Sequence, residues 1–325
     1  MTNQLELSEK KISITSTAFD FVALFVAVVS LSMAGILIRL SESEISPIAT
    51  TFNRLWIATL VFGLWNGVNS TGNRLFDKPT EHQEPYTSGM IGQLVAAAAI
   101  ASVSLLLLNW SLAHTSIANA IVLRNASALF TPLLGWLVLG QRYDSKFLIG
   151  MVVAVGGVIA LGWKDLQIAN TNLQGDTAVL LSAMFTSIFL LIVEQLRTKL
   201  TTTTILLWRC GIGTLFTLPI FLLAGDRFFP YSLVGWLAII GQAVICQGLG
   251  QGLMVYSLKR LSSGFISLVV PLEIILATIA GWVVFSEKVS LFSGLAFCVI
   301  LLGMYLATSS KSTVKPYGFR SKIVE

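Results

Sequence analysis

The sequence predicts an all-α integral membrane protein of ten transmembrane helices, arranged as two inverted five-helix repeats around a central cavity. Three observations predict this class: the composition, ten apolar segments and an internal repeat. Of the 325 residues, 55% are hydrophobic and 11% are charged, whereas soluble domains contain about 25% charged residues. With a mean hydropathy of +0.81, the composition excludes soluble, nucleic-acid-binding and fibrous proteins.

Each predicted helix is an apolar segment that meets or approaches the roughly 20 residues needed to cross a hydrocarbon core about 30 Å thick. In chain order the segments are 19–39, 48–68, 90–112, 116–139, 146–163, 177–197, 203–224, 232–257, 262–285 and 289–308. The first is longer than the apolar core of about 7–15 residues in a signal peptide, so we expect an uncleaved span. The predicted organisation is an N-terminal tail (1–18), two repeats (19–163 and 177–308) and a basic C-terminal tail (309–325).

Basic residues are distributed unevenly between the loops. If the N-terminus is cytoplasmic, 14 lysines and arginines fall on the inner side and 4 on the outer side, and 3 of the 21 lie within the spans. Cytoplasmic loops of membrane proteins are enriched in lysine and arginine. We therefore expect a multi-pass protein of the inner (plasma) membrane with both termini in the cytoplasm. The net charge of +5 then reflects topology rather than an acidic partner.

The two halves of the sequence align with each other at an offset of 146 residues. "NWSLAHTSIANAIVL" (109–123) aligns with "VYSLKRLSSGFISLV" (255–269), and "GWLVLGQR" (135–142) aligns with "GWVVFSEK" (281–288). Earlier in each half, Arg54 aligns with Arg209 at an offset of 155. Because five spans is an odd number, the second half enters the membrane from the opposite side. Such an inverted repeat places a binding site near the midplane, where the halves meet.

The same motifs carry a family resemblance. A Trp/Tyr-x-Leu turn, a helix, "GWLVLGQR" or "GWVVFSEK", and a glycine-punctuated helix follow one another in both halves. This order resembles the EamA-type branch of the drug/metabolite transporter superfamily, and the resemblance covers the whole chain apart from its tails. It implies ten helices around a central cavity, with segments 146–163 and 289–308 as scaffold.

Individual residues agree with the family pattern only in part. Glu273 and Glu287 look like two acidic positions that are common in the second half of family members. In the first half, Gln141 stands where the resemblance predicts a glutamate. Pro132 and Pro271 are displaced from the usual proline position of the family. These departures bear on the mechanism more than on the fold.

Two ionisable residues lie close to mid-bilayer. At a rise of 1.5 Å per residue, Arg124 lies roughly 12 Å into segment 116–139 and Glu273 roughly 16 Å into segment 262–285. Intramembrane ionisable residues usually face a bundle interior or a water-filled cavity, and a guanidinium fork suits a carboxylate or phosphate. We expect Arg124 and Glu273 to form a substrate clamp or gate. A salt bridge that only holds the halves together is the alternative.

Further polar and aromatic residues are candidates for lining the cavity. Ser127 and Thr131 share a predicted helix face with Arg124. In "GQAVICQGLGQG", Gln247 and Gln251 share a face, and the glycines permit bending or close packing. The remaining candidates are Asn109, Trp110, Tyr256, Arg54 and Arg209. The aromatic residues could equally form an interfacial belt, and the last two arginines could snorkel to the interface.

The motifs favour transport over catalysis. The sequence contains no P-loop, no H-x-x-x-H zinc pair and no insertion large enough for a catalytic domain, so we expect no enzyme activity, metal or cofactor. The predicted function is secondary transport of a small polar metabolite, an amino acid or organic anion, by alternating access. The alternatives are an exporter of cationic or amphipathic drugs that uses Glu273, and a membrane channel. The expected partners are the substrate and the lipid bilayer, with a proton as the candidate coupling ion and no nucleic acid.

Overall fold

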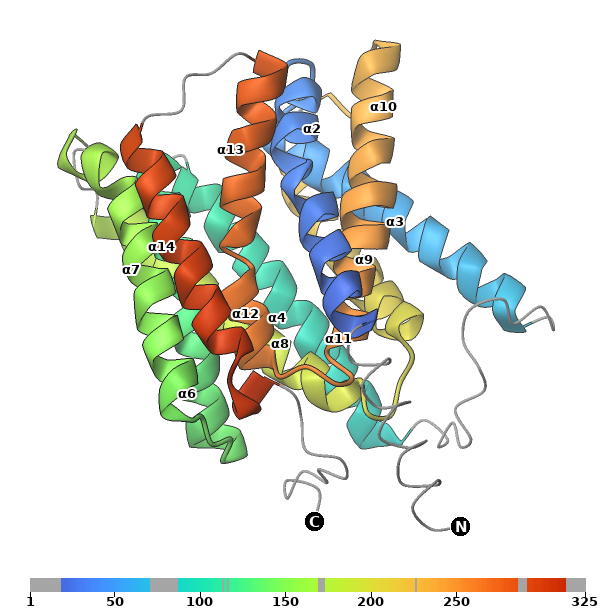
Figure 1. The fold of residues 1–325 in the computed structure, drawn as a ribbon. Helices are drawn as coiled ribbons and strands as arrows, with labels where there is room; N and C mark the ends of the chain where they lie inside the picture. The colour runs from blue at the N-terminus through green and yellow to red at the C-terminus, as the bar shows by residue number, and fades with distance from the viewer. Residues whose placement is uncertain are drawn as a thin grey trace.

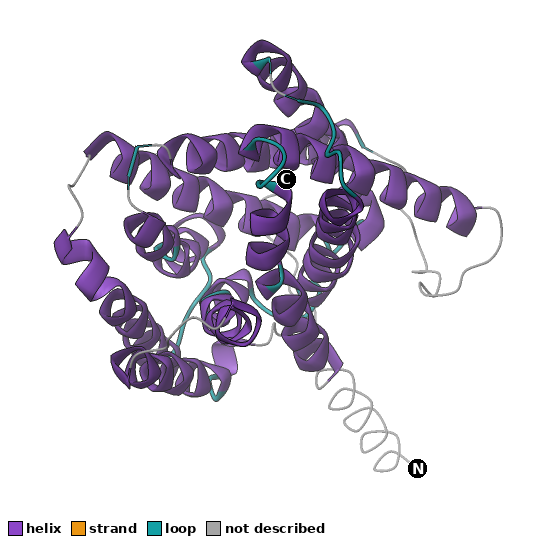
Figure 2. Cartoon of the chain, turned by 90° about the horizontal axis from the view of Figure 1, so that it is seen from above, coloured by secondary structure: helices purple, strands orange, loops and turns teal. Residues whose placement is uncertain are grey.

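The computed structural model describes residues 19–70, 87–112, 114–115, 117–168, 173–225, 227–285 and 291–313. Glu287, residues 1–18 and residues 314–325 lie outside this part of the chain. The described residues form a bundle of helices that run up and down between two ends (Figures 1 and 2).

Ten helical segments build the described part of the bundle (Figure 1). In chain order they are Phe19–Ser41, which ends in α2 (Ala34–Ser41); α3 (Pro47–Ser70); α4 (Ser88–Leu112); α5 (Ile117–Arg124) with α6 (Ser127–Leu139); α7 (Ser145–Ile168); α8 (Leu173–Leu196); α9 (Thr202–Ala224); α10 (Leu233–Gly241) with the π-helix η1 (Gln242–Gly250) and α11 (Gln251–Ser257); α12 (Ser263–Val269) with α13 (Leu272–Phe285); and α14 (Leu291–Thr308). A short 3₁₀ turn, η2 (Lys311–Thr313), follows.

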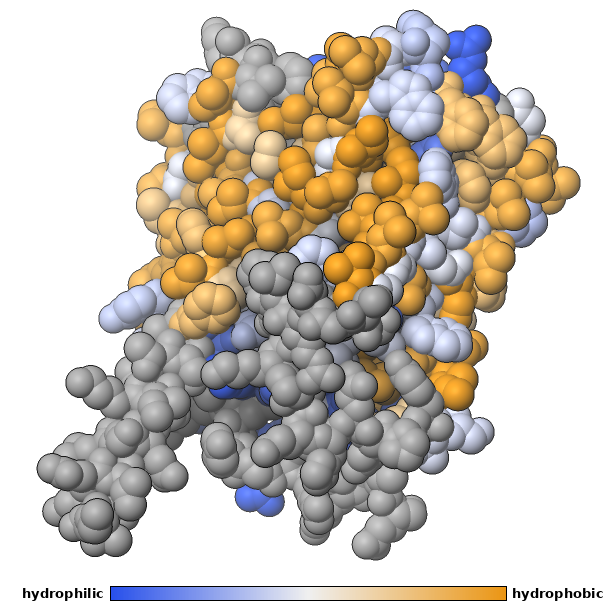
Figure 3. Space-filling model, turned by 90° about the vertical axis from the view of Figure 1, so that its right-hand side faces the viewer, coloured by the Kyte–Doolittle hydropathy of each residue, from blue (hydrophilic) through white to orange (hydrophobic). Residues whose placement is uncertain are grey.

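Length and apolar composition make eight of these segments able to cross a membrane. The other two segments are α3 and α7. Large apolar side chains point outward along the bundle, and they cover much of the face seen in Figure 3. An exposed apolar surface of this extent is expected where lipid tails, rather than water, surround the helices. The protein is therefore an all-α membrane protein.

Local sequence explains where several helices begin and end. The side chains of Thr201, Ser232 and Ser262 cap α9, α10 and α12 by accepting hydrogen bonds from backbone N–H groups of the first turn, as small polar residues commonly do. Gly140 and Gly225 end α6 and α9 with φ values of 62° and 66°. Glycine adopts this left-handed conformation without steric cost.

Besides the first segment, which has a turn at Met33 before α2, three segments that the sequence predicts as continuous helices are irregular. The segment of α5 and α6 is interrupted at Asn125 and Ala126, and the segment of α12 and α13 is interrupted at Val270 and Pro271. Asn125 and Pro271 are equivalent at the offset of 146 residues. Proline lacks a backbone N–H, which accounts for the second interruption. In the segment of α10 and α11, the glycine- and glutamine-rich run forms η1, and π-helical turns are frequent at functional sites.

One end of the bundle brings together the start of the first segment, the turn between α11 and α12, and the residues after α14. Arg260 Nη1 lies 3.2 Å from Asp20 Oδ2. The N–H of Ser262 donates a hydrogen bond of 3.0 Å to the carbonyl of Thr313. The chain therefore enters its first segment and leaves its last at the same end.

The opposite end is joined by two other carboxylates. Glu44, between the first segment and α3, accepts hydrogen bonds from the backbone of Tyr231 and Ser232 at 3.0 and 3.1 Å. The Ser232 hydroxyl also donates to Glu44, which lowers the pKa of that carboxyl. Asp176 at the start of α8 accepts a 2.5 Å hydrogen bond from Thr115. Each end of the bundle thus has its own polar contacts between segments.

Helices α7 and α14 lie side by side (Figure 1) because small residues face each other. A Cβ atom added at Gly157 would lie 2.7 Å from Ile300 Cγ1, whereas one added at the neighbouring Gly156 would meet no atom within 4 Å. The predicted scaffold pair is therefore packed through one face of α7.

We expect Gly157→Val to lower the stability of the protein by about 1–3 kcal/mol, because the larger side chain forces α14 away from α7. Gly156→Val is the matched control, since both variants change helix propensity equally. Thermal unfolding in detergent, followed by fluorescence-detected gel filtration, should show the loss for Gly157→Val alone. Equal losses in both variants would contradict close packing at this face.

Candidate functional site

Three arginines and one glutamate of the predicted spans lie near one another. Arg54 is on α3, Arg209 is on α9, Arg124 ends α5, and Glu273 is in the first turn of α13. The three guanidinium groups are close enough to interact electrostatically with one another, and that of Arg124 also interacts with the Glu273 carboxylate. We call these four residues the arginine cluster.

Arg54 and Arg209 occupy equivalent positions of the two halves. Neither side chain extends towards the membrane–water interface. Arg209 donates a 2.7 Å hydrogen bond from Nη1 to Gln251 Oε1, and its guanidinium lies 4.8 Å from the centre of the Phe189 ring. Such stacking is favourable for a guanidinium. The Nε atom of Arg54 is buried without a hydrogen-bond partner. Both side chains therefore point into the bundle. The sequence had left open whether they do so or snorkel to the membrane–water interface.

Arg124 and Glu273 flank the two equivalent helix interruptions. Arg124 lies in the last turn of α5, and Glu273 lies in the first turn of α13, so each charge is favoured by the dipole of its own helix. The Arg124 side chain is exposed and that of Glu273 is half-buried. Among the described residues, the two charges make no ion pair within 4.0 Å. The two charges therefore interact at a distance, without a closed salt bridge in this conformation.

Ser127 and Thr131 do not continue the exposed face of Arg124. Both are buried, and the Thr131 hydroxyl donates a 2.8 Å hydrogen bond to the Ser127 carbonyl. Ser187 on α8 donates to the same carbonyl at 3.3 Å. Both residues lie beyond the interruption at Asn125 and Ala126, in α6, which contacts α8. A continuous helix, as the sequence predicts, would have kept all three on one face.

The two glutamines of the eighth segment approach the arginine cluster. Gln251 binds Arg209, and Gln247 Nε2 lies 3.6 Å from Cys210 Sγ, next to Arg209 in α9. Gln247 lies within η1 and Gln251 directly follows it. The sequence pattern located these residues but did not reveal the π-helix. It also missed Phe189, which no motif distinguishes from other apolar residues of α8.

The remaining candidates are divided between the interior and the ends. Asn109 donates a 3.4 Å hydrogen bond to Thr51, one turn before Arg54 on α3. Trp110 is 45% exposed, with its ring stacked on His114 at a centroid distance of 4.0 Å. Tyr256 lies near the end of α11, where its ring is 5.8 Å from the Arg197 guanidinium. The structure thus brings Asn109 towards the arginine cluster but not the two aromatic residues.

A buried carboxylate explains one departure from the family pattern. Glu194, at the end of α8, accepts hydrogen bonds from Gln141 Nε2 at 3.1 Å and from the Ser263 hydroxyl at 2.5 Å. The Tyr143 hydroxyl donates to Gln141 Oε1 at 2.5 Å. Burial, together with the charge of Glu194, raises the pKa of Tyr143, so the phenol stays a donor. A glutamine at position 141 serves as a neutral donor where a glutamate would face a second carboxylate.

We expect Gln141→Glu to make stability depend on pH. The introduced carboxyl would lie beside Glu194, and a like charge raises its pKa in the folded state. An acid whose folded pKa is raised destabilises the fold increasingly as pH rises above its unfolded value of about 4.3. The gap in melting temperature between this variant and the wild type should therefore widen from about pH 5 to pH 8.

The isosteric control is Gln141→Met, which loses the hydrogen bond without adding a charge. Its loss of about 1 kcal/mol should not change over the same pH range. A gap for Gln141→Glu that is also constant would show that the two carboxyls do not interact.

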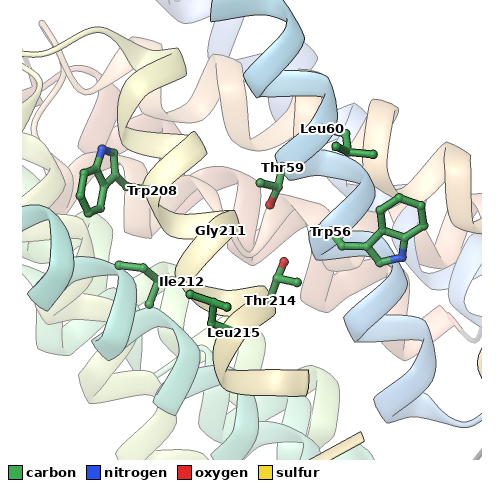
Figure 4. Close-up of a pocket in the computed structure, with 8 residues that line it drawn as sticks. All are labelled: Trp56, Thr59, Leu60, Trp208, Gly211, Ile212, Thr214 and Leu215. Carbon is green, nitrogen blue, oxygen red and sulfur yellow. The ribbon is translucent and has the colours of Figure 1, made fainter. Parts of the chain in front are cut away.

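A recess where α3 crosses α9 is mainly apolar, in contrast to the charged arginine cluster. It has a volume of about 470 Å³ and is lined by Trp56, Thr59, Leu60, Trp208, Gly211, Ile212, Thr214 and Leu215 (Figure 4). The Thr59 and Thr214 hydroxyls each donate to a carbonyl of their own helix at 2.8 Å. Leu60 and Leu215 are 54% and 68% exposed on the outside of the bundle. The recess therefore offers mainly hydrocarbon and suits lipid better than a polar metabolite.

The comparisons with known proteins agree with this architecture. The sequence model of the EamA-like transporter family matches the chain twice, at residues 19–163 and 173–309. An uncharacterized transporter of Archaeoglobus fulgidus is 24% identical over 298 residues, which cover 89% of this chain and 97% of that protein. An uncharacterized transporter of Methanothermobacter thermautotrophicus is 23% identical over 199 residues, which cover 60% of this chain and 57% of that protein.

A solved crystal structure shares the fold. It superposes with a TM-score of 0.74 at 15% sequence identity, and the superposition covers 90% of this chain and 97% of the other. Together with the helical membrane bundle, the two matches to the family's sequence model cover nearly the whole described chain. The protein is thus a non-enzymatic membrane transporter, and the chain belongs to the EamA-like transporter family.

Proposed function

We propose that this chain is a secondary transporter that moves a small polar metabolite, of the amino-acid or organic-anion class, across the inner membrane by alternating access. The observation that carries the proposal is the arginine cluster, because ionisable residues within membrane spans are costly and usually mark the path of a substrate or ion. Arg124, Glu273, Arg54 and Arg209 would bind the substrate, and Gln247, Gln251 and Asn109 would support them. Ser127 and Thr131 would join them if the packing against α8 opens.

Two inverted five-helix halves around a central cavity would provide the two access states. The interruptions at Asn125 and Pro271 support this proposal, since they fall at equivalent positions of the two halves. The packing supports it as well: α7 contacts its equivalent α14, and α3 contacts its equivalent α9. Broken helices near the midplane are typical of substrate sites in such transporters.

Gating would take place at the two ends of the bundle. Gln141 of the first half binds Glu194 of the second, and Glu44 of the first half binds Ser232 of the second. Both contacts cross between the halves. We propose that they break in turn as the halves rock against each other, so that the arginine cluster opens to one side at a time.

The proposed topology follows from the excess of basic residues on one side. Reporter fusions after Lys146 and after Lys311 should read as cytoplasmic, and a fusion after Lys164 should read as external. A fusion after Lys311 that reads as external would contradict ten spans with both termini in the cytoplasm.

Uptake into proteoliposomes tests the function itself. Purified protein should take up members of a labelled panel of amino acids and organic anions, and an imposed pH gradient should change the extent of uptake if a proton is the coupling ion. Organic cations in the same panel test for a drug exporter. Uptake of cations alone would favour that alternative, and flux that never saturates would favour a channel.

A further inference from the structure

We infer that the substrate is a small organic dianion, either a dicarboxylate or a phosphate monoester. The inference rests on the proposed function and names the ligand class of the same site. Its basis is the charge balance of the arginine cluster, in which three guanidinium groups interact with one another and only that of Arg124 interacts with a carboxylate, that of Glu273. With Glu273 ionised, the cluster carries a net charge of +2.

The described residues supply no second anion at this site. In the described part of the chain, Arg54, Arg124 and Arg209 make no ion pair with a carboxylate within 4.0 Å. The hydrogen-bond partner of Arg209 is the neutral amide of Gln251, and Arg54 Nε is buried without a partner. A buried charge that lacks a counter-ion is strongly destabilising. In the part of the chain that the structure describes, Arg54 and Arg209 therefore lack a counter-ion until a ligand enters the cluster.

The nearby thiols do not balance the charge. Cys246 donates a 3.4 Å hydrogen bond to the carbonyl of Ser30, so its thiol keeps its proton. Cys210 is buried in α9, and its contact is with the neutral Gln247 amide at 3.6 Å. An unperturbed thiol is mostly protonated at neutral pH. Both cysteines thus remain neutral.

The other carboxylates near the helix ends have partners of their own. Asp20 pairs with Arg260, and Glu194 binds Gln141 and Ser263 at the same end. At the opposite end, Glu44 binds Ser232, and Asp176 binds Thr115. Glu273 is accordingly the one carboxylate of the described residues that interacts with the arginine cluster.

The arrangement of the guanidinium groups suits two negative charges rather than one. The three groups come from three different helices, α3, α5 and α9. Each guanidinium presents a fork that binds a carboxylate or phosphate through two hydrogen bonds. A ligand with two negative charges would neutralise the cluster together with Glu273. A monoanion would leave one positive charge uncompensated, and a zwitterion would leave two.

Matched pairs of substrates test this inference. In counterflow with proteoliposomes at pH 7.5, succinate is compared with succinamate, which replaces one carboxylate by an amide at the same length. Glycerol phosphate, a dianion at this pH, is compared with glycerol, and the two pairs distinguish a dicarboxylate from a phosphate monoester. The dianion of at least one pair should half-saturate transport at a concentration about tenfold or more below that of its partner.

A charge-reducing variant provides a second readout. Arg54→Gln lowers the net charge of the cluster to +1, so the preference for the dianion over succinamate, or over glycerol, should fall by about tenfold. Arg260→Gln removes an arginine at the end of the bundle and should leave the preference unchanged.

Two negative results have different meanings. If succinamate or another monoanion is transported as well as every dianion, the dianion inference is overturned, and the proposed transport function stays intact. If protein that is folded in the liposomes shows counterflow with none of the metabolites in a broad panel, the proposed function is overturned.

Discussion

Replacing Arg124 by glutamine should reduce transport by about two orders of magnitude, which corresponds to the loss of roughly 3 kcal/mol, the size of a hydrogen bond to a charged group of the substrate. Arg124 interacts with both other arginines and with Glu273. Without it, Glu273 would face an anionic substrate directly and repel it. The measurement is initial uptake into proteoliposomes, normalised to the amount of folded protein.

The stability of the same variant separates a binding role from a structural one. Removing Arg124 relieves two repulsions and loses one attraction, and no ion pair within 4.0 Å is broken in the described part of the structure. The melting temperature should therefore change by less than about 3 °C, the shift that corresponds to roughly 1 kcal/mol. Full transport with a large fall in melting temperature would identify Arg124 as a structural residue.

Exchanging the two charges, Arg124→Glu with Glu273→Arg, should abolish transport in a folded protein. The exchange keeps the net charge of the arginine cluster but moves the cation from the end of α5 to the start of α13. The positive charge would then meet the substrate from the wrong helix. Each charge would also oppose the dipole of its helix, at a cost of about 0.3–1 kcal/mol each. Uptake and melting temperature are measured together.

The exchange discriminates between the two explanations of the pair. A salt bridge that only joins the halves would tolerate the exchange and keep transport. Glu273→Gln, the matched single variant, should lower stability, since it removes the carboxylate that offsets the three arginines. Full activity of the exchanged protein would refute a role for Arg124 and Glu273 in binding.

Much of the fold follows from the sequence because membrane spans have a strong physical signature. Apolar segments of spanning length located all ten helical segments, and the family resemblance is confirmed. The helix interruptions at Asn125 and Pro271 were not predicted. A single proline or asparagine within a long apolar segment is compatible with a straight, kinked or broken helix, and only packing against neighbouring helices decides between them.

The site was harder to predict than the fold. Arg124 and Glu273 stood out because charges are rare at mid-bilayer, but the sequence could not show that Arg54 and Arg209 turn inward. Their positions near the starts of α3 and α9 permit snorkelling as well as an interior orientation. The direction depends on partners from distant parts of the chain, such as Gln251 for Arg209. The role of Gln141 likewise depends on Glu194, 53 residues away.

The most direct test of alternating access at the arginine cluster is the accessibility of one residue from both sides of the membrane. A single cysteine in the variant Gln251→Cys, in a background without Cys210, Cys246 and Cys298 that still transports, would be treated with a membrane-impermeant thiol reagent. Val153→Cys and Val299→Cys in the scaffold helices α7 and α14 are the controls. We expect labelling of Gln251→Cys from either side, protection by substrate, and no labelling of the controls. Labelling from one side only, unchanged by substrate, would contradict alternating access at this site.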